Sequence, residues 1–365
     1  MIMLSLFLGC LSSEKSSAET DVTATMNLNW QELDPYSKGP FSVGHTQIEH
    51  TYIPIPDQPP RTIFIEVWYP TDDTSGEDAI YHLGTDENSF AQALPAAPIY
   101  PNGYPLMVHS HGFQGWGANS AAIMRYMASH GWVIGAPNHT DNLLSDYQEP
   151  LPTAHWIHRP LDIQQTIDGV TELEEFSQMV DAENVLLTGH SFGASYTSWV
   201  VAGATLENAN HLCDTGEGLE DTEALCSDTE REMFLSGELA DRRVKAAISY
   251  VGTIRDSFIG EQGYKTIFTP MFHMSGTEHR HNRSVAQLER VESIDYRWLS
   301  IEGGCHETFG TGACSTLDGE QGFLIAGSYS VMFGRTFVLE DPQFVDVLSG
   351  AQQPFAEALL HHKPE

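Results

Sequence analysis

Residues 189–193, with the sequence GHSFG, have the residue types of a serine nucleophile site. They follow the apolar run Val185 to Thr188 and precede a run of small residues. Glycines two positions before and after the serine allow a tight turn between a strand and a helix, which exposes the serine hydroxyl. The N-terminus of the following helix offers backbone N–H groups to a developing oxyanion. We therefore predict that Ser191 is a nucleophile.

A serine hydroxyl needs a base to take its proton, and the chain has 17 histidines from which to choose. In sites of this type the histidine comes last in the chain, after the serine and an acid. His306 follows the last predicted strand, on the glycine-rich segment 303–309 with the sequence GGCHETF. We predict that His306 is the general base that activates Ser191.

The segment 109–113, with the sequence HSHGF, is the candidate for the second half of an oxyanion hole. It follows an apolar run, and its glycine lets the chain turn inward. We expect the backbone N–H groups of Phe113 and Phe192 to bind the oxyanion. We interpret His109 and His111 as structural hydrogen-bonding residues.

These positions require a scaffold, and short apolar runs alternate with amphipathic stretches along most of the chain. Such alternation predicts an α/β fold, with a mostly parallel sheet that helices cover on both faces. We predict strands at 61–69, 106–109, 133–136, 185–188, 244–251, 270–275 and 296–301. We predict helices at 118–130, 160–180, 192–202, 322–339 and 342–350.

Two polar stretches interrupt this alternation. Residues 72–101 are polar and contain several prolines, so we expect a long surface loop. Residues 204–241 are acidic and contain two cysteines, and we interpret them as an insertion or lid over the carboxyl edge of the sheet. We take 39–350 as the catalytic domain and 351–365 as a C-terminal tail.

Several segments together resemble a known family: FIEVWYP at 64–70, the stretch at 106–142, GHSFGA at 189–194, VKAAISYV at 244–251 and IEGGCHETFG at 301–310. They are similar to the bacterial relatives of platelet-activating-factor acetylhydrolases, a group often labelled predicted dienelactone hydrolases. Bacterial polyester hydrolases of the cutinase type resemble them more distantly. The similarity covers roughly Gly39 to Gly350. It implies an α/β-hydrolase fold, with Ser191 and His306 as nucleophile and base.

The resemblance also implies a reaction, the hydrolysis of carboxylic esters through an acyl-enzyme. The family suggests short-acyl, phospholipid-type or polyester substrates. Phe113, Trp116 and Phe192 suggest an apolar acyl or aromatic group, with Trp116 as a substrate-binding residue. The same residues would also serve a lactone or amide hydrolase.

The acid that orients the histidine departs from the family pattern. In much of the group an aspartate stands three residues after the glycine corresponding to Gly276, and this chain has His279 there. The acetylhydrolases proper carry an aspartate directly after the strand that ends here at Tyr250, where this chain has Val251. Glu278 is the nearest substitute, and Asp256 is the alternative. A non-catalytic surface lipoprotein on a hydrolase scaffold therefore also stays open.

The cysteines indicate export. The apolar residues 1–9 end at Cys10, and this resembles a bacterial lipoprotein signal in which the cysteine is lipidated. Residues 11–38 would then form a tether. The other four cysteines fall into two local pairs, Cys213 with Cys226 and Cys305 with Cys314, which as disulfides would require an oxidising compartment. We expect a lipoprotein of the bacterial cell envelope, or a secreted or periplasmic protein.

The net charge of −33, from 50 acidic and 17 basic residues, argues against nucleic acid as a partner. We expect contact with a membrane only through an N-terminal lipid, and we expect a monomer. Neither the histidines at 273–281 nor the acidic residues at 214–228 follow the spacing of a known metal site. We therefore expect no metal and no cofactor.

Overall fold

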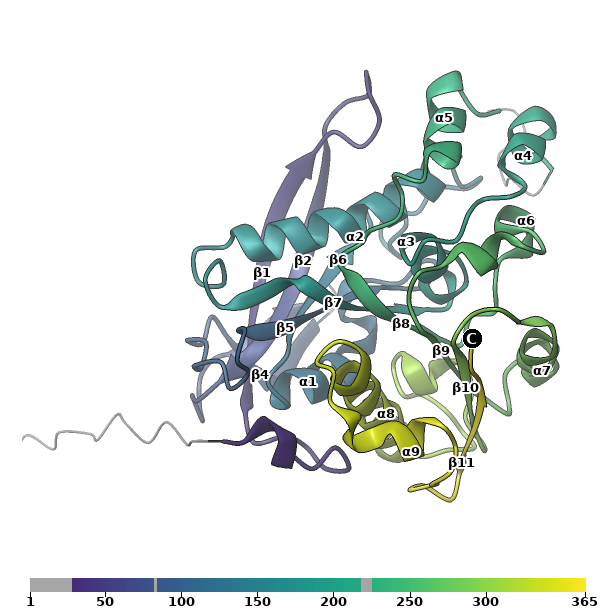
Figure 1. Cartoon of the computed structure of the whole chain (residues 1–365). Coiled ribbons are helices and arrows are strands. Elements are labelled where there is room, and N and C mark those ends of the chain that lie inside the picture. The colour runs from purple at the N-terminus through teal and green to yellow at the C-terminus, as the bar shows by residue number, and fades with distance from the viewer. Residues whose placement is uncertain (1–27, 82–83, 218–224) are drawn as a thin grey trace, which may run out of the picture.

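One large sheet forms the centre of the fold. The computed structural model describes residues 28–81, 84–217 and 225–365, and within them the sheet has 11 strands. Their order is β11-β10-β9-β8-β7-β5-β6-β2-β1-β4-β3 (Figure 1). Strands β5 to β10 pair in parallel, and the strands on either side of them are mostly antiparallel. The prediction of a mostly parallel sheet is confirmed.

The parallel strands are buried along most of their length. Helices cover both faces, and for this reason these strands read as continuous apolar runs instead of alternating ones. The bounds are β5 Tyr104–Ser110, β6 Val133–Asn138, β7 Val180–His190, β8 Val244–Tyr250, β9 Met271–Gly276 and β10 Tyr296–Ile301. Because parallel strands end at the same edge, the turns that follow them meet there.

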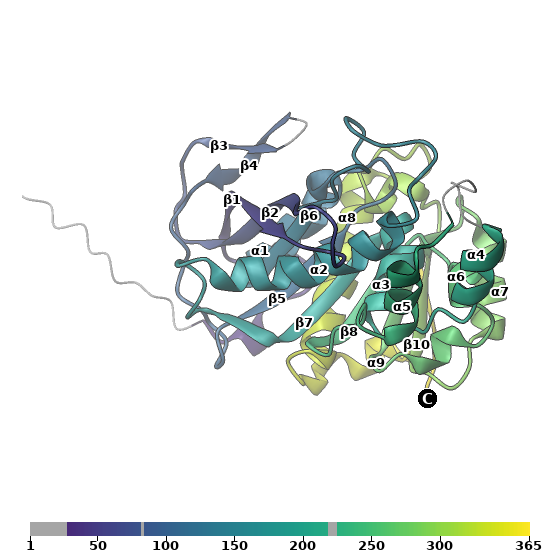
Figure 2. The ribbon, with the colours of Figure 1, turned by 90° about the horizontal axis from the view of Figure 1, so that it is seen from above.

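Four helices cover the two faces of the sheet: α1 Ala121–Ser129, α2 His155–Glu172, α3 Ser198–Val201 and α8 Gly319–Phe337. Trp156 of α2 and Trp199 of α3 belong to one hydrophobic cluster, on one face. Met124 of α1 and Met332 of α8 belong to the other cluster, on the opposite face. Figure 2 shows the sheet between these two layers.

The antiparallel side of the sheet is larger than the sequence suggested. Strand β1, Ser42–Tyr52, pairs with β2, Arg61–Thr71, along its whole length. Residues 72–101 are not simply a loop, because they contain β3, Asp78–Tyr81, and β4, Gly84–Ala91. Strand β3 has only four residues and β4 is polar, so neither shows the apolar alternation that identifies a strand in a sequence.

Both ends of the described chain pack on the domain. Residues 351–365, expected as a tail, include β11, Ala358–Lys363, which pairs antiparallel with β10 and covers its backbone edge. Within the expected tether, the ring of Trp30 lies 5.3 Å from that of Tyr100, and Arg335 donates to the carbonyl oxygens of Gln31 and Leu33. The tether therefore does not extend to residue 38. Cys10 and residues 11–27 lie outside the described residues.

The insertion at 204–241 carries α4, Ala209–Thr215, and α5, Asp228–Ser236, and the disulfide Cys213–Cys226 closes it as predicted. It lies beside α6, Asp256–Ile259, where Asn208 donates to the carbonyl oxygen of Asp256. The remaining helices are α7 His281–Arg290, α9 Val345–Leu348 and the short turns η1 Trp30–Glu32, η2 Gly117–Ser120, η3 Gly193–Thr197, η4 Gly263–Thr266, η5 His306–Phe309 and η6 Pro342–Phe344. Among the described helices, none combines the length and the apolar composition that crossing a bilayer demands.

Candidate active site

A cavity of about 950 Å³ lies at the carboxyl edge of the parallel strands. Ser191, His306, Phe113 and Phe192 come from three separate turns, after β7, β10 and β5, and all four line it. The structure thus brings together the predicted nucleophile, base and oxyanion residues. The described residues of the insertion do not line this cavity, and a role of the insertion as a lid stays a prediction.

Ser191 sits in the strained turn that the sequence predicts. Its φ is 53°, in the left-handed region that residues other than glycine rarely adopt. Its N–H donates to the carbonyl oxygen of Tyr250 (3.0 Å), which fixes the turn to the neighbouring strand. A side chain at Gly193 would collide with the backbone oxygen of Ser110, so the close approach of η3 to β5 requires glycine there.

His306 begins η5, in the loop that follows β10. The disulfide Cys305–Cys314, predicted from the sequence, closes this loop. The His306 ring lies 4.8 Å from the ring of His190 and 4.5 Å from that of His279. Burial and the nearby His190 lower the pKa of His306 to about 4, although the carboxylate of Glu307 opposes the shift. His306 is therefore neutral at pH 7, as a general base must be.

The predicted acids are not in contact with His306. Glu278 is exposed, and its Oε1 lies 3.4 Å from the hydroxyl of its neighbour Thr277. Asp256 forms an ion pair with Arg290 at 2.8 Å. Instead, Nε2 of His279 lies 3.3 Å from Nδ1 of His306. The position that carries an aspartate in the resembling family thus does face the base, but here it holds an imidazole.

The other family position for the acid is also close to the nucleophile. Val251 follows β8 directly and lines the same cavity as Ser191. Its φ is 57°, and a β-branched residue in this conformation is a genuine outlier. Its N–H donates to the carbonyl oxygen of Met274 (2.8 Å). The turn after β8 therefore keeps a strained conformation although valine has no carboxylate to present.

The predicted oxyanion loop lies against the nucleophile. A Cβ atom at Gly112 would lie 3.1 Å from Cβ of Ser191, so only glycine fits without displacement. Buried Arg159 of α2 donates to the carbonyl oxygens of His111 (2.7 Å) and Gly112 (3.1 Å). Its guanidinium also lies 4.6 Å from the centre of the Phe192 ring. One arginine thus contacts both halves of the predicted oxyanion hole.

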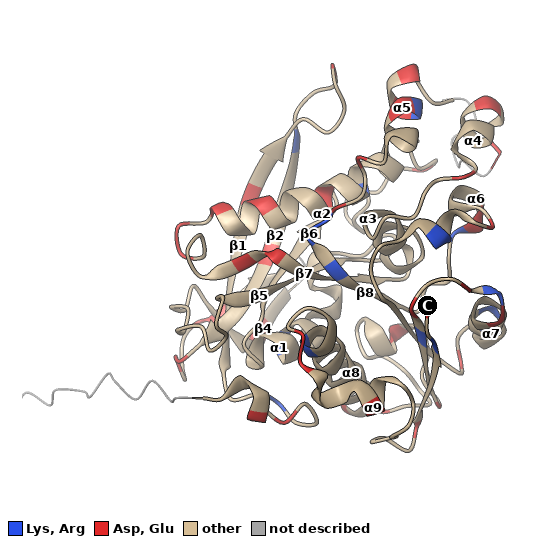
Figure 3. Cartoon of the chain, in the orientation of Figure 1, with Lys and Arg blue, Asp and Glu red and all other residues tan. Residues whose placement is uncertain are grey.

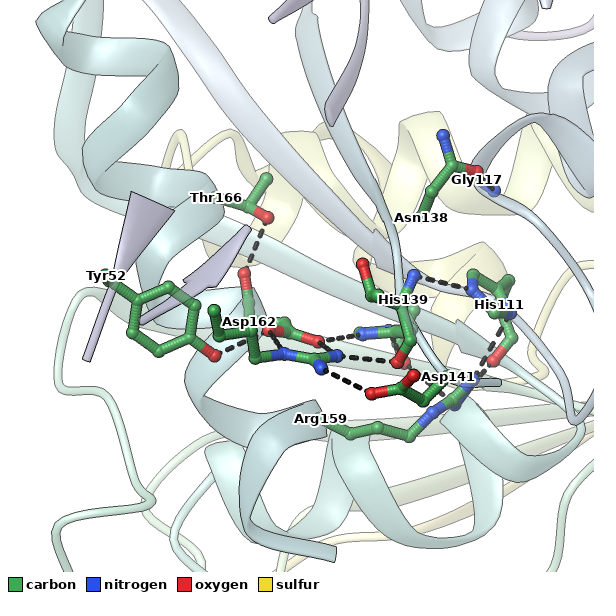
Figure 4. Close-up of polar contacts among 12 residues, drawn as sticks. Tyr52, His111, Gly117, Asn138, His139, Asp141, Arg159, Asp162 and Thr166 are labelled. Atoms are coloured by element: carbon green, nitrogen blue, oxygen red, sulfur yellow. Dashed lines mark hydrogen bonds and ion pairs between the residues drawn. The ribbon is translucent and has the colours of Figure 1, made fainter. Parts of the chain in front are cut away.

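A buried polar network connects the part of α2 from Arg159 to Thr166 with residues of other elements (Figure 4). Asp162 accepts hydrogen bonds from Arg61 Nε (2.8 Å) and from Tyr52 Oη (2.5 Å), and it bonds to His139 Nδ1 (2.8 Å). Burial alone would raise the pKa of Asp162, but Arg61 holds it well below its ordinary value. The backbone N–H of His139 donates to Nε2 of His111 (3.0 Å), which links this network to the oxyanion loop.

Sequence reasoning missed this network because its members lie far apart in the chain. The available signal was Arg159 among the apolar residues Trp156, Ile157 and Ile163, where an unpaired charge would be very costly to bury. Burial lowers the pKa of Arg159 to about 9, so it still carries its charge at pH 7. His111 is a structural hydrogen-bonding residue, as predicted, and so is His109, which bonds to Thr188 at 2.9 Å.

Trp116 was expected to bind substrate, but it does not line the cavity. Its side chain packs against the hydrophobic cluster on the α1 and α8 face. Phe113 and Phe192 are the aromatic residues that do line it. Within the described residues, no group of three His, Cys, Asp or Glu side chains is placed to hold a metal ion.

Known proteins resemble this chain in part of its sequence and in its fold. Residues 92–148, which include the oxyanion loop, match the family described as platelet-activating factor acetylhydrolase, isoform II. The structure of ferulic acid esterase from Streptomyces cinnamoneus is similar with a TM-score of 0.59, over 90% of this chain and 98% of that chain, at 19% identity. The comparison with curated proteins gives no match. The predicted α/β-hydrolase fold is confirmed, as is the resemblance to the acetylhydrolase family.

Proposed function

We propose that this α/β-hydrolase is a serine carboxylic-ester hydrolase that works through an acyl-enzyme. The observation that carries the proposal is the left-handed conformation of Ser191 at the edge of a cavity that His306 and Phe113 also line. Such strain in a residue other than glycine persists where the surrounding structure enforces it, and it concentrates at functional sites. The acetylhydrolase family match and the esterase with a similar fold support ester hydrolysis.

In the proposed reaction, Ser191 attacks the ester carbonyl while His306 takes the hydroxyl proton. The N–H groups of Phe113 and Phe192 bind the oxyanion, and such a donor typically contributes about 10²- to 10³-fold in rate. His306 then gives the proton to the alcohol as the ester bond breaks, and the acyl group stays bonded to Ser191. Water, activated by His306, then releases the acid.

We propose that His279 takes the place of the missing acid. His306 can accept the serine proton at Nε2 only if its Nδ1 carries a hydrogen, and His279 Nε2 lies within hydrogen-bond distance of that atom. An imidazole acceptor holds this tautomer and orients the ring. Unlike a carboxylate, it provides no negative charge for the imidazolium that forms during catalysis, so we expect a slower enzyme than one with a complete triad.

A fluorophosphonate probe tests the proposal, because it labels only an activated serine. We expect labelling of the folded protein and none of Ser191→Ala. The absence of labelling in folded protein would instead favour the alternative of a non-catalytic surface lipoprotein.

The class of bond needs a second measurement. We expect turnover of para-nitrophenyl esters of short chain length, and less turnover of lactones and anilides. Short-acyl, phospholipid-type and polyester substrates should then be compared directly. Turnover of anilides without turnover of esters would replace the esterase proposal with an amidase.

We further propose that the protein is exported. The two disulfides agree with an oxidising compartment. Lipidation of Cys10 is the finer proposal, and mass spectrometry of the N-terminal peptide from the native host tests it. An unmodified peptide that begins before Cys10 would contradict it.

A further inference from the structure

The wall of the active-site cavity is unusually basic for this protein. Arg255, Arg280, Arg283 and Arg290 all line it, although the whole chain has only 17 basic residues against 50 acidic ones. Asp256 is the one carboxylate among the residues that line it in the described part of the chain. In Figure 3, blue segments lie on α7 and beside α6, on a surface where red is otherwise common.

Two of these arginines already have partners inside the protein. Arg290 pairs with Asp256 at 2.8 Å, and Arg255 stacks 4.8 Å from the centre of the Trp156 ring. Within the described residues, neither Arg280 nor Arg283 forms an ion pair or a side-chain hydrogen bond. Although the protein is rich in carboxylates, none that the structure describes pairs with these two arginines at the cavity wall. Both arginines are therefore available to a ligand.

Helix α7 and the residue before it place arginine side chains at the cavity. Arg283, Gln287 and Arg290 lie three or four positions apart, so they share one face of the helix, and all of them line the cavity. Arg280 precedes the helix with a φ of 45°. Burial is the main cause of the lowered pKa of His279 and His306, the charge of Arg280 adds to both shifts, and Arg283 adds to that of His279. Both arginines therefore act on the catalytic side of the cavity.

Part of the wall beside these arginines is polar as well. Ser275, Ser284 and Gln287 are buried, and they bond to groups of the protein such as Trp298 Nε1 and Tyr296 Oη. A guanidinium presents a fork of N–H donors that matches a carboxylate or a phosphate.

We infer that the cavity selects esters that carry an anionic oxyacid group, a carboxylate or a phosphate, away from the bond that is cleaved, and that Arg280 and Arg283 bind this group. The inference rests on the proposed ester hydrolysis at Ser191 and names the substrate class of that site. Both side chains are exposed, so the selectivity will decrease as salt screens their charge.

A series of matched substrates tests the inference. It consists of 4-nitrophenyl esters of six-carbon acids whose far end is a carboxylate, a phosphate, a methyl ester or a trimethylammonium group. We expect kcat/KM for the anionic esters to exceed that of the neutral ester about ten- to a hundredfold at low salt, because hydrogen bonds to charged groups have this strength. The carboxylate and phosphate members distinguish the two sources of negative charge.

The double variant Arg280→Gln/Arg283→Gln should lose most of this ratio between anionic and neutral esters. Arg242→Gln is the matched control, because Arg242 is exposed and stacks on Phe268 away from the cavity. It should keep both the activity and the ratio. The inference would be overturned if the wild type cleaved anionic and neutral esters with nearly equal kcat/KM, or if the double variant kept the wild-type ratio. A preference for the cationic ester would overturn it too.

Binding provides a readout that does not depend on catalysis. Calorimetric titration of Ser191→Ala with monomethyl adipate and with dimethyl adipate compares an anionic ligand with its neutral form. We expect tighter binding of the anionic ligand, and loss of this preference when Arg280 and Arg283 are also replaced. Equal affinities would refute anion selection even if the esterase proposal holds. Anion selection without turnover of any ester would refute the esterase proposal alone.

Discussion

At the scale of single residues, the base has an unusual neighbour. Within the described residues the hydrogen-bond partner of the His306 ring is another imidazole, that of His279, at 3.3 Å. A carboxylate in this place would stabilise the protonated form and raise the pKa of His306. Here burial and the adjacent His190 lower the pKa of His306 to about 4. The pH dependence of the enzyme follows directly from this difference.

The wild-type protein should stay active at mildly acidic pH. The base works only when neutral, so kcat/KM rises as the pH increases through the pKa of His306 in the free enzyme. Because this pKa is lowered to about 4, the acidic limb should lie well below the ordinary histidine value of roughly 6.5. A pH profile of kcat/KM with a neutral ester checks this. An inflection at or above pH 6.5 would contradict the lowered pKa.

Replacing His279 with aspartate should restore the family arrangement. The carboxylate of His279→Asp would favour the imidazolium of His306 and shift the acidic limb upward, by about 1 to 3 pH units. We also expect a higher kcat, because the charge stabilises the transition state. Glu278→Gln is the control, since Glu278 is exposed and contacts Thr277. If Glu278→Gln shifted the acidic limb of the pH profile and His279→Asp did not, Glu278 would be the acid that orients His306.

At the scale of elements, α2 and the loop after β10 hold the two sides of the site in place. Arg159 of α2 bonds to two consecutive carbonyls of the oxyanion loop. Phe113, which follows these carbonyls, lines the cavity. On the opposite side, the loop that carries His306 is closed by Cys305–Cys314, nine residues apart. Each connection has a consequence that can be measured.

Arg159→Lys should impair catalysis more than binding. Lysine keeps the buried charge, but it cannot donate to both carbonyls as the planar guanidinium does. We expect kcat to fall about 10- to 100-fold with a smaller change in KM, since oxyanion donors act mainly in the transition state. Arg243→Lys is the matched control, because Arg243 pairs with Asp168 on the outer part of α2. Equal effects of the two variants would indicate a purely structural role for Arg159.

Removing the two disulfides should have different consequences. Cys305→Ser/Cys314→Ser should lower both the thermal midpoint and kcat, because the His306 loop is then held less firmly. Cys213→Ser/Cys226→Ser should lower the midpoint only, since the described residues of the insertion do not line the cavity. Closure of such short loops contributes roughly 3 kcal/mol in the chain-entropy model. Thermal melts and ester kinetics check both variants, and loss of activity with the second pair alone would contradict this assignment.

At the scale of the whole molecule, many histidines are buried in an acidic protein. Burial lowers the pKa of several enclosed histidines, among them His109, His111, His130, His139, His155 and His273. For His109 and His139 it reaches about 3. These side chains are neutral in the folded protein, whereas the unfolded chain protonates them near pH 6.5.

Stability should therefore decrease as the pH falls from about 6.5 to 5. In this range the unfolded chain binds protons that the folded protein does not, so the free energy of unfolding decreases by up to about 1.4 kcal/mol per pH unit for each such histidine. Chemical denaturation at several pH values measures the slope. In His109→Asn the slope should be smaller by the contribution of about one proton. A free energy of unfolding that does not change over this pH range would contradict the prediction.

The sequence predicted those parts of the site whose residues lie close together in the chain. The elbow at Ser191, the loop of His306 and both disulfides follow from local spacing and from the order of residues in the chain. The sequence could not place His279 against His306, because a difference of one position on a turn decides whether Glu278 or His279 faces the base. Arg159 and strand β11 were missed for a related reason, since their partners lie far away in the sequence.

The left-handed turn at Val251 bears on how readily the site could change. Asp tolerates this conformation better than a β-branched residue, and such strain costs about 1 to 3 kcal/mol. Many valine codons become aspartate codons by a single base change, and every histidine codon does. An aspartate at His279 is thus one base change away, and an aspartate at Val251 is one base change away from two of the four valine codons. Selection on a library of such mutants would show whether a faster esterase is within immediate evolutionary reach.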